Sequence, residues 1–308
     1  MSLPQPFGGI VPPVSTPFTV SGDVDVASLE KLLRHLLDGG VHGLFVLGST
    51  GEMAALSDAQ REQILDISVR YAAGQVPVIA GIIDMGTTAV LEHARIAERL
   101  GADAVVATAP FYIRPNQEEI KRHFRALREA VDIPVFAYDI PANVQVVLER
   151  ATIVELAREG VIAGLKDSSG NEPNFRAVVM DTRDIDNFAV FTGAELTCDY
   201  AMLAGADGIV PGLGNVDPAG YVRLYNLAKE GKWDEARAEQ ERLFRLFDII
   251  YQATPGRTGF TASALGGFKT ALQLLGVVES NAMAVPMTAL DHEETARIRA
   301  ILVEAGLL

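Results

Sequence analysis

The chain has little cysteine, no long apolar run and many fewer basic than acidic residues. Cys198 is the single cysteine among 308 residues, which excludes a disulfide framework and a cysteine-based metal site. The 26 basic and 40 acidic residues give a net charge of −14, so an acidic surface argues against nucleic acid and anionic membranes as partners. No apolar run approaches the ~18 residues that suggest a membrane span.

Several motifs are missing as well. The first residues, Met1 to Pro6, have neither the basic region nor the apolar core of a signal peptide. No set of His, Asp and Glu residues has metal-ligand spacing, and no Ser/His/Asp triad has a nucleophile elbow to start from. We therefore expect a cytoplasmic enzyme that binds no metal.

Short apolar runs alternate with longer amphipathic segments along most of the chain. This alternation predicts parallel βαβ units, and eight of them in about this length predict a (β/α)8 TIM barrel, an α/β fold. We expect the barrel to occupy residues 1–225 and a C-terminal helical extension, residues 226–308, to pack on it. The predicted strands are Gly9–Thr19, Gly43–Gly48, Val76–Ile83, Ala104–Pro110, Pro134–Pro141, Val161–Asp167, Phe188–Gly193 and Gly208–Gly212.

The most informative residue is Lys166, at the end of the apolar run that begins at Val161. A buried lysine is costly unless it is used, and burial disfavours the charged form of the amine. Such an amine is a nucleophile near neutral pH, which is what a Schiff-base lysine requires. The alternative is a strand-end lysine whose ammonium reaches solvent. The first interpretation is favoured, and it predicts carbonyl chemistry with no cofactor.

Active sites in this fold lie at the carboxyl ends of the strands, so the residues after each strand are the candidates. Ser49 and Thr50, after the second strand, suit a carboxylate or serve as a plain helix cap. Tyr138, after the fifth, either relays protons or is a core tyrosine. Tyr112, on a loop with a second aromatic and Arg114, either forms a site wall or packs the loop. Glu195, after the seventh, meets substrate hydroxyls or is a first-turn helix charge.

Three motifs occur in order at the ends of strands two, five and six. They are Gly48-Ser49-Thr50-Gly51-Glu52, Tyr138-x-x-Pro141 and Gly164-Leu165-Lys166-Asp167-Ser168. With them, the chain resembles the dihydrodipicolinate synthase / N-acetylneuraminate lyase family of class I aldolases over essentially its whole length. The motifs are specific for the family and much less so for the substrate.

The resemblance implies the following. Lys166 forms an imine with pyruvate or another 2-oxo acid, Ser49 and Thr50 hold the carboxylate, and Tyr138 is the acid/base. Tyr138 is linked through the Ser49 hydroxyl to Tyr112, which in this family often comes from the neighbouring subunit of a homotetramer made of two tight dimers. The residues expected to bind substrate are Ser49, Thr50, Ser168, Gly193, Glu195 and Ile209.

Two positions depart from the family pattern. Members that make the lysine precursor carry an arginine shortly after Tyr-x-x-Pro to hold the carboxylate of the aldehyde substrate, and the matching residue here is Asn143. A neutral amide cannot replace a bidentate guanidinium. Asp139 stands where an asparagine is usual, and the sequence offers no account of it.

The first hypothesis is therefore a Schiff-base aldolase or dehydratase acting on a 2-oxo-3-deoxy sugar acid. The alternatives are 4-hydroxy-tetrahydrodipicolinate synthase, which joins pyruvate to aspartate semialdehyde, a metal-dependent aldolase, and a non-catalytic barrel that binds a 2-oxo acid. The combination of Lys166, Tyr138, Ser49 and Tyr112 argues against the last, because a binder has no need of the lysine.

Overall fold

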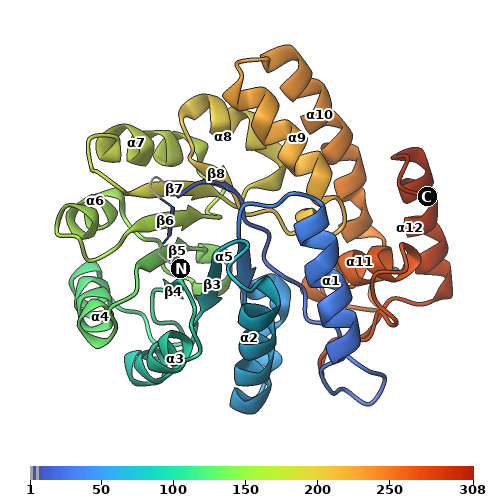
Figure 1. The fold of residues 1–308 in the computed structure, drawn as a ribbon, viewed down its shortest axis with the longest axis horizontal. Coiled ribbons are helices and arrows are strands. Elements are labelled where there is room, and N and C mark those ends of the chain that lie inside the picture. Colours follow the sequence, from blue (N-terminus) through green and yellow to red (C-terminus); the bar gives the residue numbers. More distant parts are fainter. Residues whose placement is uncertain (1–2, 5–6) are drawn as a thin grey trace.

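The computed structural model describes residues 3–4 and 7–308. Eight parallel strands form one sheet in the order β1-β8-β7-β6-β5-β4-β3-β2. A parallel bridge between Pro13, just after β1, and Phe45 in β2 joins the two ends of this order. The sheet therefore closes on itself, and the predicted barrel is confirmed (Figure 1).

Each of the eight predicted strands is present but shorter than its apolar run. Their bounds are β1 Gly9–Ile10, β2 Leu44–Val46, β3 Val78–Gly81, β4 Ala104–Thr108, β5 Val135–Asp139, β6 Gly164–Asp167, β7 Ala189–Thr192 and β8 Gly208–Ile209. The largest difference is in β1, which was predicted to reach Thr19. Pro12, Pro13 and Pro17 lack the N–H groups that a continuous ladder needs, so only isolated bridges continue beyond Ile10.

Helices surround the strands (Figure 1). The barrel helices are α1 Val26–Asp38, α2 Asp58–Ala72, α3 Thr87–Arg99, α4 Gln117–Ala130, α5 Pro141–Val144, α6 Arg150–Arg158, α7 Glu172–Thr182, α8 Cys198–Ala204 and α9 Pro218–Lys229. The spacing of five leucines predicts an apolar stripe on α1; Leu29, Leu32, Leu33 and Leu36 are fully buried, whereas Leu37 is half-buried. Capping boxes begin α2 at Ser57 and α4 at Asn116.

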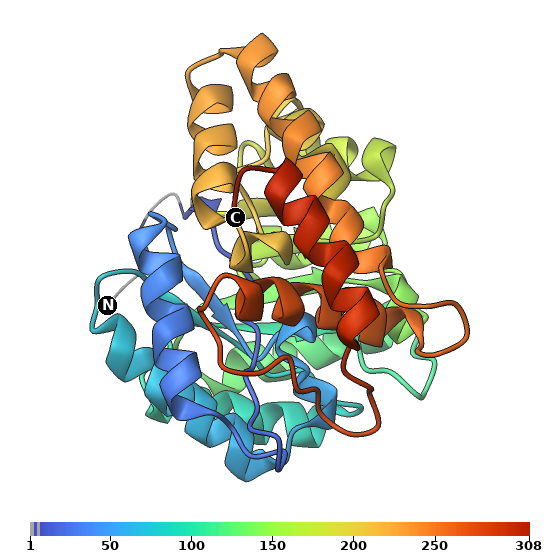
Figure 2. The ribbon, with the colours of Figure 1, turned by 90° about the vertical axis from the view of Figure 1, so that its right-hand side faces the viewer.

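The C-terminal helical part is present. It comprises α10 Trp233–Leu246, the short 3₁₀ helix η5 Phe247–Tyr251, α11 Phe260–Leu274 and α12 His292–Glu304. Figure 2 shows α11 and α12 crossing one side of the molecule, with the chain between them forming long loops. The predicted boundary after residue 225 falls inside α9, which also contacts β1 and α10.

The described residues contain no helix that is long and apolar enough to cross a membrane.

Candidate active site

Lys166 lies in β6 and is only 7% exposed. The register pairs it with Tyr138 of β5 on one side and Phe191 of β7 on the other. Its Nζ atom is 4.0 Å from the ring centroid of Tyr138 and 4.9 Å from that of Phe45. The amine is therefore enclosed by aromatic rings inside the barrel, next to the tyrosine predicted as its proton carrier.

Gly193 and Ser168 belong to the same cluster. A Cβ atom at position 193 would lie 2.2 Å from the Ser168 hydroxyl oxygen and 3.2 Å from Cε of Lys166. Real Cβ atoms do not approach other atoms to 2.2 Å, so any larger residue here would displace the Ser168 hydroxyl. Glycine thus keeps space beside the lysine side chain. The structure brings Gly193, Ser168 and Lys166 together at the ends of β6 and β7.

Ser49 and Thr50 begin the 3₁₀ helix η1 Ser49–Gly51, directly after β2. Both are half-buried, and neither side-chain hydroxyl hydrogen-bonds to another residue in the described part of the chain. The loop continues through the second 3₁₀ helix, η2 Met53–Ala55. Glu52 between them has a φ of 58°, a left-handed conformation that is unusual for a residue with a side chain.

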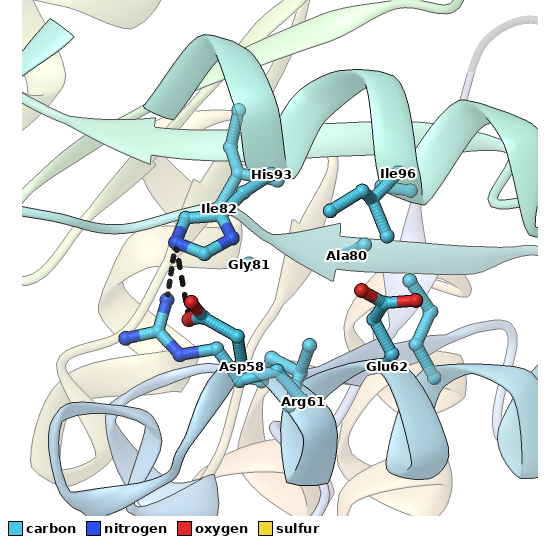
Figure 3. A pocket seen from close by; sticks show the side chains of 11 residues that line it. Asp58, Arg61, Glu62, Ala80, Gly81, Ile82, His93 and Ile96 are labelled. Carbon is cyan, nitrogen blue, oxygen red and sulfur yellow. Dashed lines mark hydrogen bonds and ion pairs between the residues drawn. The ribbon is translucent and has the colours of Figure 1, made fainter. Parts of the chain in front are cut away.

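Neighbouring elements fix the loop after Thr50. The hydroxyl of Thr16 donates to the Gly51 carbonyl at 2.7 Å, and Arg61 of α2 donates to the carbonyl of Met53 at 3.0 Å. Figure 3 shows Arg61 with Asp58 and His93 between α2 and α3. The cavity there measures only about 20 Å³, too small for a substrate, so this cluster supports the loop.

A cavity of about 450 Å³ opens beside Ser49 and Thr50. One wall is the β2 loop, a second is Ile140 and Asn143 after β5, and the outer wall is Phe260, Thr261, Ala264 and Leu265 of α11 with Pro286 and Met287. Sequence reasoning did not assign this outer wall to the site, because it lies about 200 residues from Ser49 along the chain. Cavities of this volume hold small-molecule ligands.

The Glu195 carboxylate turns toward the loop after β8. Its Oε1 accepts hydrogen bonds from the Leu213 N–H at 2.7 Å and the Tyr221 hydroxyl at 3.2 Å. Burial raises its pKa to about 7, against the opposing effects of these donors and of nearby Lys166. The side chain is therefore neither a plain first-turn charge nor exposed in the cavity. It is a carboxyl on a half-buried residue, tied to the loop after β8 and near enough to Lys166 to feel its charge.

Tyr112 is 93% exposed, so in its own chain it does not pack on the barrel. Its φ of 71° is strained for an aromatic residue, and such strain is typical of functional positions. It lines a second cavity, of about 270 Å³, with Met85, Phe111 and Asn143. Within the described residues its hydroxyl does not hydrogen-bond to Ser49 or Tyr138, so one chain does not form the predicted relay.

Asn143 lines both cavities, whereas Ile209 is fully buried in β8. The Ile209 carbonyl accepts a hydrogen bond from the Val11 N–H at 2.9 Å and so belongs to the strand ladder.

Asp139 and Asp167 form a pair of buried carboxyls. They directly follow Tyr138 and Lys166 and are register partners on adjacent strands. One oxygen of Asp139 accepts from the Leu148 N–H at 3.0 Å, and one oxygen of Asp167 accepts from the Ser169 N–H at 2.7 Å. Burial, together with the charge of Asp167, raises the pKa of Asp139 to about 6, against the opposing effect of the Leu148 N–H. Burial likewise raises the pKa of Asp167.

Comparison with known proteins gives a consistent family. A family model described as "Dihydrodipicolinate synthetase family" matches residues 6–305. The 4-hydroxy-tetrahydrodipicolinate synthase of Desulfotalea psychrophila is 31% identical over 99% of this chain and 98% of its own length. An uncharacterized DapA-like lyase of Halobacterium salinarum is 33% identical over 97% of this chain and 94% of its own.

Solved structures agree with these relatives. The dihydrodipicolinate synthase of Bacteroides thetaiotaomicron superposes with a TM-score of 0.91 at 36% identity, covering 98% of this chain and all of the other. YagE of Escherichia coli K12, a member of the same family solved in complex with pyruvate, gives a TM-score of 0.91 at 28% identity, covering 98% and 99% of the two chains.

Proposed function

The chain belongs to the dihydrodipicolinate synthetase family, whose enzymes are lyases, and on this premise we propose that it is a Schiff-base-forming lyase of 2-oxo acids. One observation carries the proposal. Lys166 is buried with its Nζ atom 4.0 Å from the Tyr138 ring, beside the space that Gly193 keeps open. A lysine enclosed in this way can serve as a nucleophile toward a keto carbon.

In the proposed reaction the Lys166 amine adds to the keto carbon of the 2-oxo acid, and loss of water gives the imine. The imine is an electron sink. It stabilises the enamine left by carbon–carbon cleavage, or the enamine needed for addition to an aldehyde. Ser49 and Thr50 hold the carboxylate of the 2-oxo acid through their free hydroxyls, and Tyr138 carries the proton between substrate and solvent.

We propose that the aldehyde partner carries no charge, as is true of the aldehyde released when a 2-oxo-3-deoxy sugar acid is cleaved. In the described part of the chain, the large cavity is lined by neither lysine nor arginine, and Asn143 stands at the place of the carboxylate-binding arginine. Within the large cavity a second carboxylate, such as that of aspartate semialdehyde, therefore has no guanidinium to bind, whereas Arg114 lines the smaller cavity that Asn143 also borders. Because relatives of this chain are named 4-hydroxy-tetrahydrodipicolinate synthases, that activity is the alternative proposal.

The test is a panel of sugar-derived 2-oxo acids, and of pyruvate with aspartate semialdehyde, analysed by product mass. Turnover of at least one sugar-derived acid that persists with a chelator and disappears in Lys166→Ala supports the proposal. Turnover that a chelator abolishes, or that Lys166→Ala retains, would contradict the imine route.

We also propose that Tyr112 acts from a neighbouring subunit of a homotetramer. Its exposure and its strained φ support this, because both are explained if the side chain enters the active site of another copy of the chain. Co-refolding Tyr112→Phe with Lys166→Ala chains tests it, since mixed oligomers then contain sites with both residues intact. Activity above that of either variant alone is expected, and no gain in verified mixed oligomers would contradict it.

A further inference from the structure

A negative charge lies beside the proposed carboxylate site. Glu52 lines the same cavity as Ser49 and Thr50 and follows Thr50 by two positions. Glu52 is only 3% exposed, so water screens its carboxylate poorly. Left alone, this charge would repel the carboxylate of a 2-oxo acid bound at Ser49 and Thr50.

Lys269 of α11 meets that charge. Its Nζ atom forms an ion pair with the Glu52 carboxylate, donates to the Ala282 carbonyl at 2.8 Å and lies 4.2 Å from the ring centroid of Phe18. The other carboxylate oxygen of Glu52 accepts a hydrogen bond from the Ala284 N–H at 2.9 Å. The C-terminal extension is thereby joined to the β2 loop at the position next to the substrate site.

Stability alone does not account for this pair. Lys269 is 2% exposed, and removing two charges from water costs about as much as their attraction returns, so apolar residues of similar volume would be as stable or more stable. A buried pair beside a binding cavity is better explained by what it does to the cavity. Burial lowers the pKa of Lys269 to about 8, although the Glu52 charge raises it. A pKa of about 8 leaves the amine mostly charged at neutral pH.

We propose that Lys269 is the counter-charge of the carboxylate site: it cancels the field of Glu52 and fixes the loop that carries Ser49 and Thr50, so that the cavity accepts the anion of a 2-oxo acid. Lys269 is then a positioning residue supplied by the C-terminal extension. The inference rests on the proposed function, in which Lys166 forms an imine with that acid.

The experiment uses borohydride to trap the imine on Lys166 and compares pyruvate with its neutral methyl ester. For each ligand, the half-saturating concentration reports binding and the maximal labelling rate reports imine chemistry. In Lys269→Met the buried Glu52 charge is unpaired. We expect the half-saturating concentration to rise roughly 10- to 100-fold for pyruvate and less than about threefold for the ester, with similar maximal rates.

A second substitution provides a rescue. In Glu52→Gln/Lys269→Met no charge remains, and pyruvate binding should return to within about threefold of the natural protein. Glu52→Gln alone keeps the cation, so it should bind pyruvate at least as well as the natural protein, relative to the ester. If the pair were merely structural, every substitution would instead weaken the binding of pyruvate and of its ester equally.

Arg257 and Glu294 provide the matched control. They form another ion pair of the C-terminal extension, with the Glu294 side chain fully buried, but neither lines the cavity. Arg257→Met should lower the melting temperature and leave the ratio between pyruvate and its ester unchanged.

The outcomes separate the two proposals. No labelling of Lys166 in the natural protein would remove the proposed function itself. Labelling in the natural protein together with an unchanged ratio in Lys269→Met, or with no recovery in the double variant, would overturn the inference alone. If Lys269→Met does not fold, Glu52→Gln decides, because weaker pyruvate binding relative to the ester in that variant contradicts the counter-charge.

Discussion

Replacing Asp139 by asparagine should stabilise the protein at neutral pH. Asp139 is 1% exposed, faces Asp167 across the β5–β6 pair, and has one carboxyl oxygen without a hydrogen-bond partner among the described residues. Asparagine has the same shape and no charge. It keeps the oxygen that accepts from the Leu148 N–H, and its amide provides a donor on the side of Asp167.

The magnitude follows from the pKa of Asp139, which burial and Asp167 raise from 3.8 to about 6. The folded protein holds this proton more tightly than the unfolded chain, so the free energy of unfolding falls as pH rises from about 4 to about 6. The shift of about 2 pKa units sets an upper limit of about 3 kcal/mol, and relaxation around the charge leaves about 1–2 kcal/mol. Asparagine has no proton to lose, so the variant should avoid this fall.

Urea unfolding at one protein concentration, at pH 4.5 and pH 7.5, measures the effect. Asp139→Asn should be more stable than the natural protein by about 1–2 kcal/mol at pH 7.5 and by clearly less at pH 4.5. Asp184→Asn is the control, because Asp184 is exposed and Arg158 lowers the pKa of its carboxyl. No gain for Asp139→Asn at pH 7.5, or an equal gain at both pH values, would refute the reasoning.

Three further substitutions test the site. Tyr138→Phe should lower turnover roughly 10²- to 10⁴-fold with a smaller change in KM, and unchanged turnover would make Tyr138 a core residue. Gly193→Ala should slow borohydride labelling of Lys166 at least about tenfold, because its Cβ atom would overlap the Ser168 hydroxyl; an unchanged rate would show that this space is not used. Asn143→Arg should raise kcat/KM for aspartate semialdehyde about tenfold or more, and equal use of this aldehyde and sugar-derived acids by the natural protein would contradict the role given to Asn143.

Sequence reasoning worked where local signals are strong. The eight apolar runs and the polar residues after them predicted the barrel, and the structure brings Lys166, Tyr138, Ser168 and Gly193 close to one another. Local start signals also agree with the structure at α7, where Asn171 caps the helix and Pro173 stands in its first turn.

Other features depend on contacts between distant parts of the chain. The pairing of Glu52 with Lys269 joins residues more than 200 positions apart, and the motif that contains Glu52 does not indicate its partner. The apolar run of Phe260, Ala264 and Leu265 reads as an ordinary helix face until α11 is placed over the cavity. The inward turn of Glu195 likewise depends on the backbone of the β8 loop, which no side-chain pattern encodes.

The central claim is that Lys166 is the nucleophile, and peptide mass mapping after borohydride treatment with pyruvate tests it most directly. The account predicts one reduced pyruvate unit on the peptide that contains Lys166, and none on the peptide that contains Lys269, a buried lysine paired with Glu52 of the cavity wall. An unmodified Lys166 peptide, or a label on another lysine, would contradict the account.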